Sequence, residues 1–258
     1  MDVRTLDHAV LAVLVALTTV LLITTPISPL VGSLLYFGLP SAYLVFRRPC
    51  IFKVALVPAL VFGTLYSLGF EYISEVSNAW IFPLADAFVL PSLFFGVVSG
   101  DLMLWYFLWV FTIIVYYEYF IDRGVCDFTV RHIRSALALG ILGLGIIAIA
   151  HYGFNTQITL FYSYAILGVL ALLPALILHL RSPHLFRKLI QSVPFLALFF
   201  LVMELTALHV GYWAFTGNYL AVISLAGHVI PLEELLFWIF GSPIIIVAYH
   251  ELFLDDGV

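Results

Sequence analysis

The stretch that decides the fold reads Glu204-Leu-Thr-Ala-Leu-His-Val-Gly-Tyr-Trp213, and it is matched 133 residues earlier by Glu71-Tyr-Ile-Ser-Glu-Val-Ser-Asn-Ala-Trp80. The same shift places Pro231-Leu-Glu-Glu234 on Val98-Ser-Gly-Asp101. A constant shift over so long a segment predicts an internal duplication. The matched positions are acids and tryptophans, and because acids are costly inside a bilayer, their presence there indicates a function.

Composition predicts an integral membrane protein. The 258 residues are 64% hydrophobic and only 10% charged, with a mean hydropathy of +1.16. A bilayer core of roughly 30 Å requires about 20 apolar residues per helix. Apolar runs of that order predict eight membrane-spanning helices near 8–24, 30–46, 54–71, 102–121, 135–151, 158–180, 190–208 and 232–250.

The basic residues predict the orientation of these helices. With eight spans, all ten lysines and arginines fall on the side of the N-terminus, which the positive-inside rule assigns to the cytoplasm. We therefore expect a multi-pass protein of the cell membrane with both termini cytoplasmic. Cys50 and Cys126 fall near cytoplasmic helix ends, so we expect reduced thiols and no disulfide framework.

The duplication predicts two tandem repeats of four helices each, residues 1–127 and 128–258, within one all-α membrane domain. Repeats with an even number of spans keep the same orientation, which predicts a pseudo-twofold axis along the membrane normal. The polar, interrupted segments 72–100 and 209–230 join the third and fourth spans of each repeat on the outer side. They are candidate walls of a central cavity, although amphipathic surface loops would have the same composition.

Five acids are predicted to meet at one membrane level. Glu71 and Glu204 end the third spans, and Asp101, Glu233 and Glu234 open the fourth spans. Desolvation favours the neutral form of a carboxylic acid, which suits a general acid that protonates a carbon–carbon double bond. The alternative is that the helix dipole favours acids at helix N-termini, an explanation that has the wrong sign for Glu71 and Glu204.

Tryptophans accompany these acids at matching spacing. Trp105 and Trp238 each follow an acid by four residues, which is about one helical turn. An aromatic face beside an acid can stabilise a developing cation by roughly 0.5–2 kcal/mol per ring. Trp80 and Trp213 either share this role or serve as anchors at the membrane interface.

No cofactor is expected. The eight histidines contain no pair spaced by three or four residues, so the ligand pattern of membrane di-iron enzymes is missing. A site formed by His209, His228 and the acids is the remaining metal alternative. The chain carries no GxGxxG fingerprint, P-loop or nucleophile elbow, and the net charge of −5 suggests no nucleic acid partner. The expected partners are the lipid bilayer and a long apolar ligand, and a homo-oligomer is left open.

At these residues the chain resembles a known family. Asn78-Ala79-Trp80 and Pro231-Leu232-Glu233-Glu234-Leu235-Leu236-Phe237-Trp238, within duplicated membrane segments, look like motifs of the small, flavin-free membrane lycopene cyclases. That family occurs as two subunits in some bacteria and as one fused chain in archaea and fungi. The resemblance covers about 71–105 and 204–241, roughly a quarter of the chain.

The resemblance implies a lycopene β-cyclase-like, redox-neutral isomerisation of a linear C40 carotenoid. A protonated acid would add a proton to the terminal double bond, an internal double bond would attack the tertiary cation, and a base would remove a proton to set the ring double bond. Glu233 and Glu234 carry over as the candidates for acid and base. Glu204, Asp101 and Glu71 remain further catalytic candidates, and the substrate-binding candidates are Asn78, Trp80, Trp105, Trp213, Phe237 and Trp238.

Alternatives from other classes stay open. Parallel repeats with intramembrane acids also fit a membrane transporter, although no cation lies deep in a predicted helix to pair with a substrate anion. A carotenoid hydratase or a prenyl-transferring elongase would act on similar ligands. The elongase would need an aspartate-rich diphosphate-binding motif, which the sequence lacks.

Overall fold

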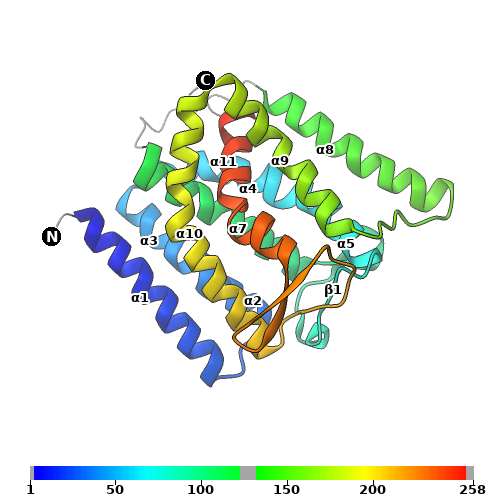
Figure 1. Cartoon of the computed structure of the whole chain (residues 1–258), viewed down its shortest axis with the longest axis horizontal. Coiled ribbons are helices and arrows are strands. Elements are labelled where there is room, and N and C mark those ends of the chain that lie inside the picture. Colours follow the sequence, from blue (N-terminus) through cyan, green and yellow to red (C-terminus); the bar gives the residue numbers. More distant parts are fainter. Residues whose placement is uncertain (1–2, 123–131, 254–258) are drawn as a thin grey trace.

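The computed structural model describes residues 3–122 and 132–253 and is mostly helical (Figure 1). Elements written η are π-helical or 3₁₀-helical segments. Before the gap the elements are α1 (Val3–Thr24), α2 (Pro29–Ser33), η1 (Leu34–Gly38), α3 (Leu39–Arg47), α4 (Ile51–Leu60), η2 (Val61–Tyr66), α5 (Ser67–Val76), β1 (Trp80–Ile81), η3 (Ala85–Ala87), β2 (Ser92–Leu93), α6 (Phe94–Val97), β3 (Val98–Ser99), α7 (Gly100–Tyr117) and η4 (Glu118–Asp122). After it they are α8 (Ile133–Ala148), η5 (Ile149–Gly153), α9 (Ser163–Arg181), α10 (Pro183–Val210), β4 (Ala214–Phe215), β5 (Val222–Leu225), β6 (His228–Pro231), η6 (Glu234–Ile239) and α11 (Ser242–Phe253).

Seven helical segments in the described part of the chain are long and apolar enough to cross a bilayer. They are Arg4–Thr24, Pro29–Arg47, Ile51–Val76, Gly100–Asp122, Ile133–Gly153, Ser163–Arg181 and Leu185–Val210. The prediction of a mostly helical, multi-pass membrane protein is confirmed at this level.

The eighth predicted span, 232–250, is broken rather than continuous. The chain leaves η6 before α11 begins, so α11 is a shorter apolar helix of its own. The break lies at Gly241, where a Cβ would stand 2.4 Å from the carbonyl oxygen of Leu236. Pro243 follows in the first turn of α11, where its missing N–H costs nothing.

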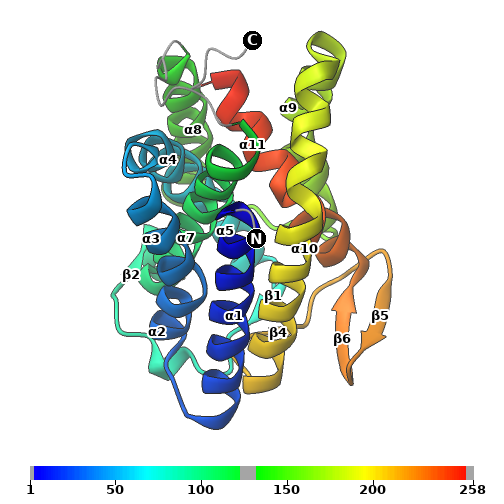
Figure 2. The ribbon, with the colours of Figure 1, turned by 90° about the vertical axis from the view of Figure 1, so that its left-hand side faces the viewer.

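The two outer segments 72–100 and 209–230 contain short strands, which the all-helical prediction did not include. β1 pairs antiparallel with β4, with Ile81 opposite Ala214, while β2 pairs with β3 and β5 with β6. Figure 2 shows β1, β4, β5 and β6 gathered toward one end of the bundle, which we call the strand end. Pairing across the two halves satisfies backbone groups that would otherwise be buried without partners.

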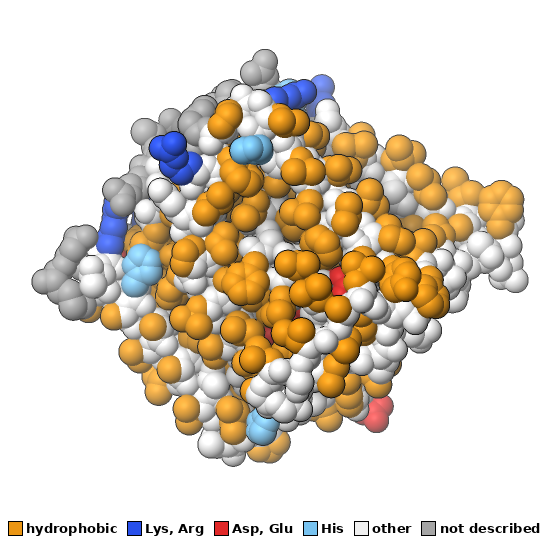
Figure 3. Space-filling view, in the orientation of Figure 1, with side chains coloured by type: hydrophobic (Ala, Val, Ile, Leu, Met, Phe, Trp, Pro, Cys, Tyr) orange, Lys and Arg blue, Asp and Glu red, His pale blue; other side chains and the backbone are white. Residues whose placement is uncertain are grey.

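The opposite end of the bundle, which we call the basic end, carries ion pairs between helices. Arg47 Nε lies 3.3 Å from Asp7 Oδ1, and Lys188 Nζ lies 2.5 Å from Asp122 Oδ1. In the space-filling view the basic side chains lie along one rim, and apolar side chains cover most of the visible face (Figure 3). An apolar belt with charges at one end is the surface expected of a protein in a bilayer.

Cys50, which lies at the basic end directly before α4, is disulfide-bonded. The expectation of a reduced thiol at this position is therefore wrong. Cys126 and the predicted boundary between the repeats lie outside the described residues. Because disulfides are rare in the cytosol, this bond and the basic residues of the same end point to opposite sides of the membrane.

α7 lies in the middle of the bundle and α8 at its edge (Figure 1). Every residue of α7 from Leu108 to Tyr117 is buried, whereas α8 buries only Ala136, Gly140 and Ile147. A helix that is apolar on all sides and buried forms the core of the domain. α7 therefore connects the strand end to the basic end through the interior, and α8 presents its outer face to lipid.

Candidate functional site

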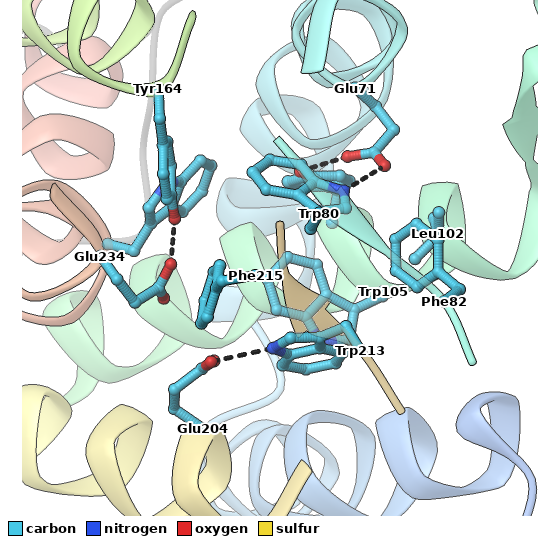
Figure 4. A pocket seen from close by; sticks show the side chains of 12 residues that line it. Glu71, Trp80, Phe82, Leu102, Trp105, Tyr164, Glu204, Trp213, Phe215 and Glu234 are labelled. Carbon is cyan, nitrogen blue, oxygen red and sulfur yellow. Dashed lines mark hydrogen bonds between the residues drawn. The ribbon is translucent and has the colours of Figure 1, made fainter. Parts of the chain in front are cut away.

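A small cavity of about 60 Å³ lies at the strand end, beside β1 and β4. Its walls consist of three glutamates, eight aromatic side chains and one leucine, which come from both halves of the chain (Figure 4). The lining residues are Glu71, Trp80, Phe82, Leu102, Trp105, Tyr106, Tyr164, Glu204, Trp213, Phe215, Glu234 and Trp238. We call this space the acid cavity.

Glu71 projects from α5 with both carboxylate oxygens hydrogen-bonded. Trp80 Nε1 donates to Oε1 at 3.0 Å, and the Tyr106 hydroxyl donates to Oε2 at 2.7 Å. The residue is only 1% exposed. A carboxyl group that accepts bonds at both oxygens is held in one orientation, so Glu71 is the most fixed of the three acids.

Glu204 on α10 repeats part of the arrangement at Glu71. Trp213 Nε1 donates to Glu204 Oε1 at 2.8 Å, across the same nine residues that separate Trp80 from Glu71. α10 ends at Val210 and is capped by Gly211, whose φ of 78° lies in the left-handed region that glycine adopts without strain. The turn that follows brings Trp213 back onto the acid, so the duplicated motif builds the same pair twice.

Glu234 reaches the cavity from the start of η6. The hydroxyl of Tyr164, on α9, donates to Glu234 Oε2. Figure 4 shows the Glu234 and Glu204 carboxyl groups near Phe215, on the side of the cavity away from Glu71. Two acids from the second half of the chain therefore face the same space.

Asp101 and Glu233 lie outside the acid cavity and hold loop backbone instead. The two Asp101 oxygens accept the N–H groups of Val89 at 2.9 Å and Leu90 at 2.8 Å. Glu233 Oε1 accepts the N–H of Leu220 at 2.6 Å. Each acid thus fastens the outer segment of its own half, and the prediction that all five acids converge on one site is wrong for these two.

Of the six predicted ligand-binding residues, the four tryptophans line the acid cavity. Asn78 instead shapes the turn before β1, with a φ of 54° and a carbonyl oxygen that accepts from Thr216 Oγ1 at 3.2 Å. Phe237 packs against Gly168, where a Cβ would lie 2.3 Å from the ring. It lines a neighbouring apolar cavity rather than the acid cavity.

The tryptophans belong to a connected aromatic wall. Trp105 lies edge-on to Trp213, with ring centroids 6.1 Å apart, and stacks on Trp109 at 5.7 Å. Trp238 lies 4.8 Å from Trp109 and 6.1 Å from Tyr164. Aromatic faces attract cations, and no lysine or arginine is among the lining residues. The wall can therefore stabilise a positive charge that arises in the ligand itself.

The sequence did not predict a role for Phe82, Leu102, Phe215 or the two tyrosines of the cavity. Tyr106 directly follows Trp105, but adjacent residues on a helix point about 100° apart, so its place at the cavity had no local signal. Tyr164 had none either, because its partner Glu234 lies 70 residues further along the chain.

Tyr219 fastens the outer segment of the second half to the turn before β1. Its hydroxyl donates to the carbonyl oxygen of Ala79 and accepts the N–H of Gly217 at 3.1 Å. Burial raises the pKa of Tyr219 to about 12, so the hydroxyl stays protonated and remains a donor near neutral pH.

The alternative metal site, formed by His209, His228 and the acids, is not assembled among the described residues. The rings of His209 and His228 lie 6.1 Å apart, but neither residue lines the acid cavity. Within residues 3–122 and 132–253, no group of three His, Cys, Asp or Glu side chains is arranged to hold a metal ion.

Comparison with protein-family models, with curated proteins and with solved structures finds no match for this chain. The resemblance to the small membrane lycopene cyclases rests on the short motifs around Trp80 and Glu234.

Proposed function

We propose that the protein is a membrane enzyme that cyclises the ends of a linear C40 polyene by acid–base chemistry, in the manner of a lycopene β-cyclase. The observation that carries this proposal is the union of three buried glutamates with four tryptophans around one cavity. Cyclisation through a carbocation needs a proton donor beside a double bond and an environment that stabilises the cation. The acid cavity contains groups suited to both tasks.

In this mechanism Glu234 delivers the proton. Tyr164 holds Glu234 Oε2, which leaves Oε1 to carry the proton to one carbon of the terminal double bond. The other carbon becomes a tertiary cation, and the electron pair of an internal double bond attacks it and closes the ring. Glu204 then removes a proton beside the new cation, which forms the ring double bond. One proton is added and one is removed, so no oxidant or reductant is consumed.

The proposed reaction is tested by expressing the chain in a bacterium that accumulates lycopene and separating the pigments by chromatography. We expect a new pigment of unchanged mass with one or two rings, because cyclisation is an isomerisation. A product heavier by one water would indicate a hydratase. Unaltered pigment in cells that contain the folded protein would contradict the proposal.

We also propose that the two halves are tandem repeats related by a pseudo-twofold axis. At the strand end, Ile81 pairs with Ala214, the position 133 residues later that corresponds to it. A residue that pairs with its own counterpart lies beside the symmetry axis. The β1–β4 ladder supports an axis that passes through this end.

A second pair of contacts at the basic end supports the same axis. Tyr117 donates to Glu251 Oε1 at 2.5 Å, and His250 Nε2 lies 2.8 Å from Glu118 Oε1. Under the shift of 133 residues Tyr117 corresponds to His250 and Glu118 to Glu251, so each contact is the image of the other. An axis through both ends of the bundle runs along the membrane normal.

For orientation, we propose that the basic end is cytoplasmic, by the positive-inside rule. We expect a cysteine in place of Arg187, an exposed residue at this end, to react with an impermeant thiol reagent only in opened cells. Leu220→Cys is the matched control at the strand end, since Leu220 is 65% exposed, and it should react in intact cells. The reverse labelling pattern would overturn this orientation.

A further inference from the structure

A second and much larger cavity lies between η2, α5, α8, α9 and α11. It holds about 460 Å³, and none of its lining residues is charged. Leu139, Ile146 and Leu170 line it and are also 53–55% exposed, so the cavity opens sideways toward lipid. We call it the apolar cavity. Its chemistry suits a hydrocarbon chain and offers nothing to a charged head group.

The apolar cavity adjoins the acid cavity at Trp238, which lines both spaces. Phe70 lies beside this tryptophan, with ring centroids 4.9 Å apart, and also stacks on Trp80 at 6.0 Å. A ligand that passes these rings would place one end among the acids and the remainder among aliphatic side chains. The acid cavity would thus be a site for the head of the ligand, and the apolar cavity would be the tail site.

On the side of the first half, the described residues enclose a far smaller cavity at the corresponding place. Pro40 corresponds to Pro174, and in that register Phe37 corresponds to Ala171. Phe37 packs edge-on against Trp105 at 5.8 Å, and the cavity that these two residues line holds only about 20 Å³. In the second half the smaller Ala171 lines the apolar cavity together with Trp238, the counterpart of Trp105. Phe37 therefore lies beside Trp105 at a position where the second half has only the methyl group of Ala171.

We propose that the apolar cavity holds the tail of the linear polyene while one end is in the acid cavity, so that the protein cyclises one end at a time. The inference rests on the proposed function and adds the path of the substrate: lateral entry from the bilayer beside α8. Because the corresponding cavity beside Phe37 holds only about 20 Å³, the second end can react only after the monocyclic product has left and re-entered in reverse.

The tail site is tested with Glu234→Gln, which retains the cavities but cannot deliver the proton. We expect the linear polyene to co-purify with this variant from pigment-producing cells. Adding Ala171→Phe should lower the bound polyene by about tenfold, because a large side chain in a fitted space costs an order of magnitude in binding or more. Gly143→Phe, from α8, is the second filling variant, since Gly143 lines the cavity and a Cβ there meets no atom within 4 Å.

Gly145→Phe is the matched control on the same helix. A Cβ at Gly145 also meets no atom within 4 Å, but this residue does not line the cavity, so polyene retention should not change. Unchanged retention in both filling variants, no polyene in Glu234→Gln, or a phospholipid in its place would each overturn the tail site. If the Glu234→Gln variants retain the polyene in the expected pattern but the unaltered protein forms no rings, the tail site would be upheld and the cyclase refuted. A bicyclic product that appears before any monocyclic one would refute cyclisation one end at a time.

Discussion

Replacing Glu234 by glutamine is expected to leave a folded membrane protein that forms almost no cyclised polyene. Glutamine has nearly the same size and keeps an oxygen that accepts the Tyr164 hydroxyl, but its amide cannot deliver a proton at neutral pH. Loss of a general acid lowers a rate by about 10²- to 10⁴-fold. The measurement is the amount of cyclic pigment per amount of protein in membranes from pigment-producing cells.

Glu233→Gln is the matched comparison, one residue away in the same motif. The Glu233 side chain lies outside the acid cavity and accepts the Leu220 N–H, a bond that glutamine can also accept. This variant should therefore retain most of the activity. Near-normal turnover in Glu234→Gln, or a loss confined to Glu233→Gln, would remove Glu234 from the mechanism.

These neighbouring glutamates illustrate what the sequence could predict about the site. Adjacent residues on a helix point about 100° apart, so the motif alone indicates that Glu233 and Glu234 need not share a role. Which of the two faces the cavity depends on the packing of η6 against α9, where Tyr164 supplies the hydrogen bond. That contact joins distant parts of the chain, and no local pattern reports it.

The duplicated motif predicted that Glu71 and Glu204 occupy matching positions, because a turn that follows a helix is a local structure. Glu71 with Trp80 and Glu204 with Trp213 are the same nine-residue arrangement built twice. The cavity wall opposite them depends on the β1–β4 ladder, which brings Phe215 beside Trp80 from the other half. In strands of two residues, the alternation of apolar and polar side chains is too short to be recognised in a sequence.

Hydropathy predicted the number of apolar segments better than their continuity. The segment 232–250 reads as one span because its residues are apolar, and the signal for the break is the short run Gly241-Ser242-Pro243. Pro243 indicates a possible helix start, but the necessity of Gly241 follows only from the closeness of the Leu236 carbonyl oxygen. Burial in the protein allows this irregular backbone at membrane depth.

Glu204→Gln is expected to lower the yield of cyclic product by about 10²- to 10⁴-fold as well, through loss of the base rather than the acid. Glutamine at this position can still accept the Trp213 N–H, which bonds Glu204 Oε1 at 2.8 Å, so the cavity wall should persist. Protonation of the substrate by Glu234 should also persist, because that acid and its Tyr164 partner are unchanged. Yield alone therefore cannot separate the two variants.

Isotope exchange in D₂O separates the two roles, because a substrate that is protonated but not cyclised can lose a proton and return to the linear form. In Glu204→Gln, Glu234 should deliver deuterium reversibly, so the recovered linear polyene should carry deuterium at the protonated carbon. In Glu234→Gln no cation forms, and the recovered polyene should remain unlabelled. Labelling in Glu234→Gln but not in Glu204→Gln would assign the proton donor to Glu204. Labelling in neither variant would mean that both carboxyl groups must act together in the first step.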